Sequence, residues 1–178
     1  MVVHTVGHST RALADFLDLL RVHGIRRLVD VRRYPASQRH PHFAGAALAA
    51  ALRAEGVDYH HEPDLGGRRT GRPDSPHTAW RSPSFRAYAD HMDTPAFGAA
   101  LGRLAALGRE APTAILCAEA VPWRCHRQLI ADALVACGIE VRHILGPAPA
   151  KPHALHPAAR VGADGRLVYA GPPTLFTP

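Results

Sequence analysis

The sequence predicts an α/β fold, a single three-layer domain in which helices flank a mostly parallel sheet. Short β-rich runs alternate with segments whose apolar residues recur at helical spacing, which is the pattern of βαβ units. The chain has 178 residues, of which 47% are apolar and 20% are charged, as in globular domains with a sizeable core. No internal repeat interrupts the alternation. We therefore expect one domain over residues 1–178.

The first expected strand and helix follow the N-terminus directly. The run "VVHTV" at 2–6 is β-rich and leads into "GHST". Ser9 or Thr10 is expected to cap the helix that follows, because their hydroxyls can accept hydrogen bonds from its first N–H groups. Gly24 is expected to end this helix. Its apolar residues at helical spacing are Leu13, Phe16, Leu17, Leu19 and Leu20.

The next strand, helix and strand repeat the pattern. The apolar run "RRLVDVR" at 26–32 predicts a strand, and "AGAALAAALRAEG" at 44–56 predicts a helix that closes at Gly56. A third strand is expected at 57–63.

The segment at about 64–94 differs in composition from the rest of the chain. It is rich in Gly, Pro, Ser and Arg and has little apolar periodicity before "SFRAYADHM". Insertions of this length in a compact domain are usually functional or disordered. Its aromatic residues Trp80, Phe85 and Tyr88 favour a long ordered insertion.

The remaining elements complete the alternation. A helix is expected over 95–108 and another over 124–137, and strands are expected at 113–117 and 140–145. The Pro-rich run "GPAPAKPHALHP" is interpreted as an extended connector. The final segment, "RVGADGRLVYA", predicts a C-terminal hairpin with an Asp-Gly turn.

Polar side chains follow four of the expected strands at the point where each strand ends. Ligands of open parallel sheets bind beyond the carboxyl ends of the strands. We therefore expect these side chains to form one site. They are His8 and Ser9 after the first strand, Asp30, Arg32 and Arg33 after the second, Glu62 after the third, and Cys117 and Glu119 after the fourth.

The stretch "LCAEAVPWRCHRQLIADAL" at 116–134 places rare residue types at the expected start of a helix. A helix N-terminus stabilises anions and lowers the pKa of a thiol. The residues at this helix start are Arg124, Cys125, His126 and Arg127. A thiolate, a phosphate or a carboxylate would be stabilised here.

The residue types of this stretch suit two kinds of cysteine chemistry, an anion-binding nucleophile loop and a metal site. Six residues separate Cys117 from Arg124, one more than in the anion-binding loop of cysteine phosphatases and rhodanese-like sulfurtransferases. This loop also holds Glu119, which would repel a phosphate. A metal site of Cys117, Cys125 and His126 lacks the usual C-x-x-C spacing, so no metal and no cofactor is predicted. The remaining interpretation is that Cys117 and Cys125 are small buried residues beside the sheet. Cys137, at the end of a helix before Gly138, is expected to have a packing role.

Acidic residues are the preferred catalytic candidates. Glu62 and Glu119 each follow a strand, and Asp30 is a third candidate unless it only pairs with the nearby arginines. Burial and charged neighbours can separate the pKa values of two carboxylates into an acid and a base. With Cys117 and His126 these form the catalytic set. The substrate-binding set is His8, Ser9, Arg32, Arg33, Gly66, Gly67, Arg68, Arg124, Cys125 and Arg127.

The net charge of +6 indicates an anionic partner, because arginine matches the geometry of phosphate. Lys151 is the only lysine, so a GC-rich genome that replaces Lys with Arg is the competing explanation. The segments "RRYPASQRHPHF" and "LGGRRTGR" interleave arginines with Tyr34, Phe43 and glycines, as phosphate contacts and base stacking require. We therefore expect a nucleic acid or nucleotide as partner.

Cellular location is predicted from the cysteines and the apolar runs. Three cysteines are an odd number, which favours a reducing compartment. No apolar run approaches the roughly 20 residues that a membrane span needs. We expect a cytoplasmic protein with no membrane partner.

Several blocks in fixed order resemble the domain-of-unknown-function 488 family. They are "TVGHST", "LVDVRRYPASQRHPHF", "YHHEPDLGGRR", "AWRSPSFRAYADHM", "LCAEAVPWRCHRQLIADAL" and "VRHIL". The resemblance extends from Thr5 to about Arg160 and implies an α/β domain of unsettled function. It brings no established catalytic residues. It does imply that the matching positions form one site, in agreement with the strand ends.

The functional hypothesis is an enzyme that hydrolyses a nucleic acid or nucleotide, N-glycosidic removal of a base being one such reaction. An acid would activate water or stabilise an oxocarbenium-like centre, while arginines hold phosphate. A cysteine-nucleophile phosphatase or sulfurtransferase is the first alternative. A binding module without catalysis is the second.

Overall fold

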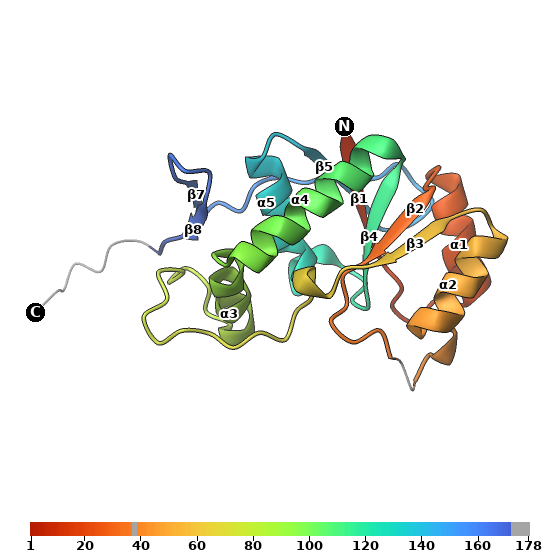
Figure 1. Cartoon of the computed structure of the whole chain (residues 1–178), viewed down its shortest axis with the longest axis horizontal. Coiled ribbons are helices and arrows are strands. Elements are labelled where there is room, and N and C mark those ends of the chain that lie inside the picture. Colours follow the sequence, from red (N-terminus) through yellow and green to blue (C-terminus); the bar gives the residue numbers. More distant parts are fainter. Residues whose placement is uncertain (37–38, 172–178) are drawn as a thin grey trace, which may run out of the picture.

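The residues of the central strand divide the protein into two cores. Side chains alternate between the faces of a strand, and Val3 lies in one hydrophobic cluster whereas Val6 lies in the other. The computed structural model describes residues 1–36 and 39–171. It shows an α/β fold with a mostly parallel six-stranded sheet, as predicted, flanked by helices (Figure 1).

The sheet has the strand order β3-β2-β4-β1-β5-β6, in which β1 to β5 are parallel and β6 pairs antiparallel with β5. This order brings the carboxyl ends of β1, β2, β3 and β4 to one edge. The strands are β1 (Val2–Gly7), β2 (Arg27–Asp30), β3 (Asp58–His61), β4 (Thr113–Cys117), β5 (Glu140–Ile144) and β6 (Lys151–Pro152).

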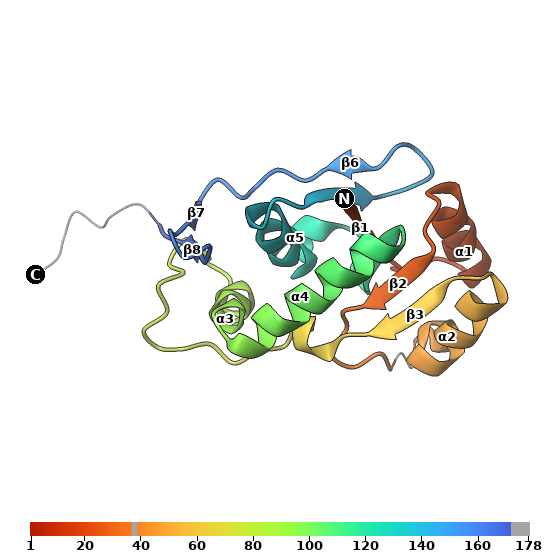
Figure 2. The same cartoon turned by 45° about the horizontal axis from the view of Figure 1, so that its top comes forward.

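Helices cover both faces of the sheet. α1 (Leu13–Val22) and α2 (Gly45–Ala54) pack on one face. On the other face lie α4 (Pro95–Glu110) and α5 (Arg127–Ala136), with α3 (Pro83–Met92) beside α4 (Figures 1 and 2). Among the described helices, none combines the length and apolarity that a bilayer crossing requires.

Two helix starts differ from the sequence prediction. Ala12, and not Ser9 or Thr10, occupies the N-cap position of α1, and no side chain caps this helix; Ser9 lies three residues earlier in a left-handed conformation with φ of 51°. α5 begins at Arg127 and not near residue 124. Pro122 starts a short 3₁₀ turn, η3 (Pro122–Arg124), that precedes the helix.

The long insertion is ordered. After the 3₁₀ turn η2 (Pro63–Leu65) it crosses to α3, where the hydroxyl of buried Tyr88 donates to the carbonyl of Leu65 at 2.7 Å. Trp80 packs against Phe85 and Tyr169 with ring centroids 4.9 and 5.3 Å apart. These aromatic contacts anchor the insertion to the C-terminal hairpin.

The C-terminal part of the chain contains one unexpected strand. The segment interpreted as a connector includes β6, which covers the edge of β5. The predicted hairpin is confirmed: β7 (Ala159–Val161) pairs antiparallel with β8 (Leu167–Tyr169), and Gly165 in its turn has a φ of 78°.

Candidate functional site

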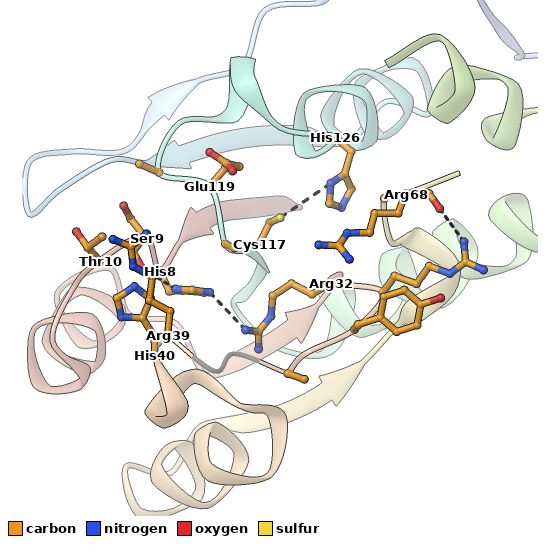
Figure 3. Close-up of a pocket in the computed structure, with 16 residues that line it drawn as sticks. His8, Ser9, Thr10, Arg32, Arg39, His40, Arg68, Cys117, Glu119 and His126 are labelled. Atoms are coloured by element: carbon orange, nitrogen blue, oxygen red, sulfur yellow. Dashed lines mark hydrogen bonds between the residues drawn. The ribbon is translucent and has the colours of Figure 1, made fainter. Parts of the chain in front are cut away.

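A cavity of about 590 Å³ opens at the carboxyl ends of β1, β2 and β4. Figure 3 shows side chains from all three strand ends directed toward it. The cavity is lined by His8, Ser9, Thr10, Arg32, Arg33, Tyr34, Ala36, Arg39, His40, Gly67, Arg68, Cys117, Ala118, Glu119, Ala120 and His126. The structure thus brings together most of the side chains that the strand ends predicted.

Gly7 allows the loop after β4 to lie against the end of β1. A Cβ at residue 7 would lie 1.8 Å from the carbonyl oxygen of Glu119, so no other residue fits. The backbone N–H groups of His8 and Ser9 donate to the carbonyls of Cys117 and Ala118 at 3.1 and 2.9 Å. These contacts place Glu119 at the rim of the cavity.

His8 is a buried, neutral wall of the cavity. Its ring stacks on Phe43 at a centroid distance of 4.3 Å, and burial lowers its pKa to about 4. Nδ1 donates to the carbonyl of Ser9 at 2.9 Å, which leaves Nε2 to accept from Arg32 at 3.4 Å. His8 therefore positions a guanidinium and is a poor proton donor at neutral pH.

Asp30 has a structural role beneath the cavity. It is fully buried, and its carboxylate accepts from Nε and Nη2 of Arg32 at 2.8 and 2.5 Å. The hydroxyl of Tyr59 donates to the same carboxylate at 2.8 Å. With these partners the carboxylate fixes Arg32, and it does not line the cavity.

The loop after η2 supplies a second wall. A Cβ at Gly66 would lie 2.7 Å from backbone atoms of Arg33, and one at Gly67 would lie 3.2 Å from Nδ1 of His126. Arg33 donates to the carbonyl of Arg68 at 2.8 Å. Arg68 has a φ of 59°, which is rare for a residue with a side chain. Such conformations often occur at functional sites.

Two thiols and an imidazole meet at the inner end of the cavity. Nδ1 of His126 lies 3.9 Å from Sγ of Cys117 and 3.6 Å from Sγ of Cys125. The hydrogen bond between the thiols raises the pKa of Cys117, as burial also does, and it lowers the pKa of Cys125. Of the two thiols, Cys125 thus has the lowered pKa, whereas Cys117, the member of the predicted catalytic set, has the raised one.

Arg124 and Arg127 lie outside the main cavity. Arg127 is fully buried, and its Nη2 donates to the carbonyl of Glu119. Its Nε and Nη1 have no hydrogen-bond partner among the described residues. Arg124 is exposed and lines an adjoining cavity of about 180 Å³ with Cys125. Arg127 therefore holds the loop, while Arg124 is directed to a neighbouring space.

Glu62 is separated from the site. Its carboxylate accepts from Arg103 at 2.8 and 2.9 Å and lines a different cavity of about 320 Å³. Of the three predicted acids, Glu119 is thus the one that lines the main cavity. The sequence could not show that an arginine on α4 would pair with Glu62.

Sequence reasoning missed several lining residues. Thr10, Arg39 and His40 line the cavity, and the clustering of arginine and histidine in "RRYPASQRHPHF" was the available signal. Ser37 and Gln38 of that segment lie outside the described residues.

A second group of potential metal ligands has a structural explanation. His77, Asp90 and Asp93 lie within reach of one another on the insertion. Arg72 pairs with Asp90 at 3.5 Å and with Asp93 at 3.0 Å, so a cation already occupies the space between the acids.

The fold and the cavity together define the class: a parallel α/β domain with an arginine-rich, thiol-containing cavity at the carboxyl edge of its sheet. The chain belongs to the family described as Domain of unknown function DUF488, whose match covers residues 12–134. This span includes α1 to most of α5 and is shorter than the resemblance read from the sequence. Comparison with curated proteins and with solved structures found no match.

Proposed function

We propose that the protein is a hydrolase that binds a nucleotide or a nucleic acid in the main cavity and removes a base by N-glycosidic cleavage. The observation that carries the proposal is the lining of the cavity: four arginines surround a space with one carboxylate, that of Glu119, among the described residues. Its volume of about 590 Å³ falls in the range of small-molecule sites, roughly 300–1,000 Å³.

Three of the four arginines that line the cavity are available to bind an anionic ligand. Arg32 is neutralised by Asp30, but within the described chain no ion pair involves Arg33, Arg39 or Arg68. Guanidinium groups match phosphate bidentately. Exposed Tyr34 lines the same cavity and offers a face for base stacking. This combination favours a ligand with both a phosphate and a base.

The position of Glu119 favours an N-glycosidic over a phosphoester bond. A carboxylate beside the phosphate would repel it, whereas the glycosidic carbon lies a sugar ring away and becomes positively charged in the transition state. A carboxylate stabilises such a centre and can activate water against it. In this mechanism Glu119 is the catalytic residue, Arg39 and Arg68 bind phosphate, and the buried pair Asp30 and Arg32 positions the binding wall.

Cysteine-based phosphoryl or sulfur transfer is the second candidate, and one observation favours it: the pKa of Cys125 is lowered by the hydrogen bond from Cys117 and by His126. Cys125 lines the adjoining cavity with Arg68 and Arg124. However, it is only 4% exposed, which restricts access to an electrophile. A module that binds nucleotides without catalysis is the third.

The test is release of free base from 5′-mononucleotides and from short single-stranded DNA and RNA, followed by chromatography and mass spectrometry. We expect Glu119→Gln to lower kcat by at least about 100-fold, the scale of general acid–base catalysis. Arg68→Ala should raise KM and weaken the salt dependence of binding. Arg109→Ala, which removes an exposed arginine remote from the cavity, is the charge-matched control.

Three results would distinguish the candidates. Base release that survives in Glu119→Gln contradicts the role of Glu119. Activity lost in Cys125→Ser but kept in Glu119→Gln supports the cysteine mechanism. Salt-dependent binding without any release of base or phosphate supports the binding module.

A further inference from the structure

We propose that Cys117, Cys125 and His126 form a binding site for one tetrahedral divalent metal ion of the zinc class, with its fourth coordination position open to the main cavity. The proposal concerns a site that the sequence spacing did not predict. It does not depend on the identity of the substrate, because metal binding can be measured without one.

The donor atoms have nearly the separations that tetrahedral coordination requires. Metal–sulfur bonds of about 2.3 Å and metal–nitrogen bonds of about 2.0 Å give a sulfur–nitrogen separation of about 3.5 Å in a tetrahedron. Nδ1 of His126 lies 3.6 Å from Sγ of Cys125 and 3.9 Å from Sγ of Cys117. All three donor atoms lie within 4.8 Å of one another. Small side-chain adjustments would therefore complete the set.

The ring of His126 is held in the orientation of a metal ligand. Its Nε2 lies 3.2 Å from the carbonyl oxygen of Val31 and donates to it. The proton on Nε2 leaves Nδ1 with a free lone pair, and that lone pair faces both sulfurs. The carbonyl is itself fixed, because Val31 is fully buried and its N–H donates to Leu116 at 3.0 Å. Ligating histidines commonly use a backbone carbonyl in this way.

The donor types select the metal. Two thiolates and an imidazole suit zinc and similar borderline ions, whereas magnesium and calcium require oxygen ligands. Two thiolates also neutralise a divalent ion, which matters because buried Arg127 carries a positive charge nearby. The metal and its two thiolates therefore have no net charge and add no further positive charge beside Arg127.

The fourth position faces the cavity. Cys117 and His126 line it together with Arg68 and Glu119 (Figure 3). Gly67 keeps the histidine accessible, because a Cβ there would lie 3.2 Å from Nδ1. Three protein ligands with one open position are typical of catalytic zinc. Water or an anionic group of a ligand in the cavity would occupy that position.

The test uses the full-length protein, reduced, freed of metal with a chelator and titrated with Co²⁺. We expect one equivalent to bind, with the visible ligand-field bands of tetrahedral Co²⁺ and the near-ultraviolet charge-transfer band of cobalt–thiolate bonds. One equivalent of Zn²⁺ should displace it. Cys117→Ser, Cys125→Ser and His126→Ala should each weaken binding by about 100-fold or more, beyond the effect of losing an outer-shell partner.

Cys137→Ser is the matched control, since this exposed cysteine lies at the far end of α5 and should leave the titration unchanged. Circular dichroism establishes that each variant is folded. The proposal would be overturned if reduced wild-type protein showed no thiolate charge-transfer band when Co²⁺ is added. It would also be overturned if the protein contained a Cys117–Cys125 disulfide and, once that bond was reduced, still bound no metal. Glu119→Gln should bind Co²⁺ normally, so loss of base release and loss of metal are separate outcomes.

Discussion

Two polar clusters of this protein differ in how completely their hydrogen bonds are made. The main cavity is lined by three arginines, Arg33, Arg39 and Arg68, that form no ion pair among the described residues, and Arg127, just outside it, has two unsatisfied nitrogens. In contrast, a buried polar chain between the sheet and the C-terminal hairpin is paired throughout. It consists of Thr5, His143, His153, Asp132 and Tyr169.

The buried polar chain has one consistent direction of donation. Thr5 donates to His143 at 2.7 Å, His143 to His153 at 2.9 Å, and His153 to Asp132 at 2.8 Å. Tyr169 donates to the other oxygen of Asp132 at 2.8 Å. No donor is left over for a ligand, which indicates a structural role. Incomplete pairing, rather than the mere presence of polar residues, therefore distinguishes a candidate site from a polar core.

The sharpest test of this contrast compares Asp132→Ala with Arg68→Ala. Removing the acid leaves His153 and Tyr169 without their common partner in the interior, so the free energy of unfolding should fall by about 3 kcal/mol. Arg68→Ala removes an exposed side chain and should change it by less than about 0.5 kcal/mol. Urea denaturation measures both. Equal losses would contradict the division into a structural and a functional cluster.

Acid should destabilise both clusters through one histidine of each. Burial lowers the pKa values of His8 and His143 from 6.5 to about 4. Between these values the unfolded chain binds more protons than the folded one. The contribution of the two neutral histidines to the free energy of unfolding is therefore fully present above pH 6.5 and is lost as the pH drops toward 4.

The measurement is the free energy of unfolding against pH. His143→Gln should reduce the slope between pH 6.5 and 4 by up to about one proton, and His8→Gln by a similar amount. His60→Gln, which removes a partly exposed histidine of β3 that belongs to neither cluster, is the control. A slope that is identical in all variants would refute the neutral, buried state of both rings.

The smallest expected effect concerns Glu62, which the sequence placed in the site. Glu62→Gln weakens a partly exposed ion pair with Arg103, and such pairs contribute about 0–1 kcal/mol. We expect base release to be unchanged. A loss of activity comparable with that of Glu119→Gln would return Glu62 to the site and show that the two cavities act together.

The fold was largely predictable because apolar periodicity reports it directly. The strand positions and the Gly24 and Gly56 helix ends followed from local pattern. β6 was missed because a two-residue strand containing Pro152 has no periodicity. The start of α5 was misplaced because Pro122 begins a 3₁₀ turn that favours an early helix reading.

The site was predictable to the level of its strand ends but not to its pairings. The rule for parallel sheets brought His8, Arg32, Cys117 and Glu119 to one edge. Sequence spacing could not reveal that the carboxylate of Asp30 forms its ion pair with Arg32, or that the turn at Pro122 brings Cys125 close to Cys117. Both depend on side-chain directions that only the folded backbone defines.

The strand order also has a consequence for synthesis of the chain on the ribosome. β1 is synthesised well before β4 and β5, yet it lies between them in the sheet, where Val3 pairs with Thr113 and Val141. Its apolar residues therefore have no strand partner until the segment that contains β4 has been made. Contacts so distant in sequence slow folding and lengthen exposure to aggregation. Completion of β4 and β5, rather than of any N-terminal unit, is the event that closes the sheet in the nascent protein.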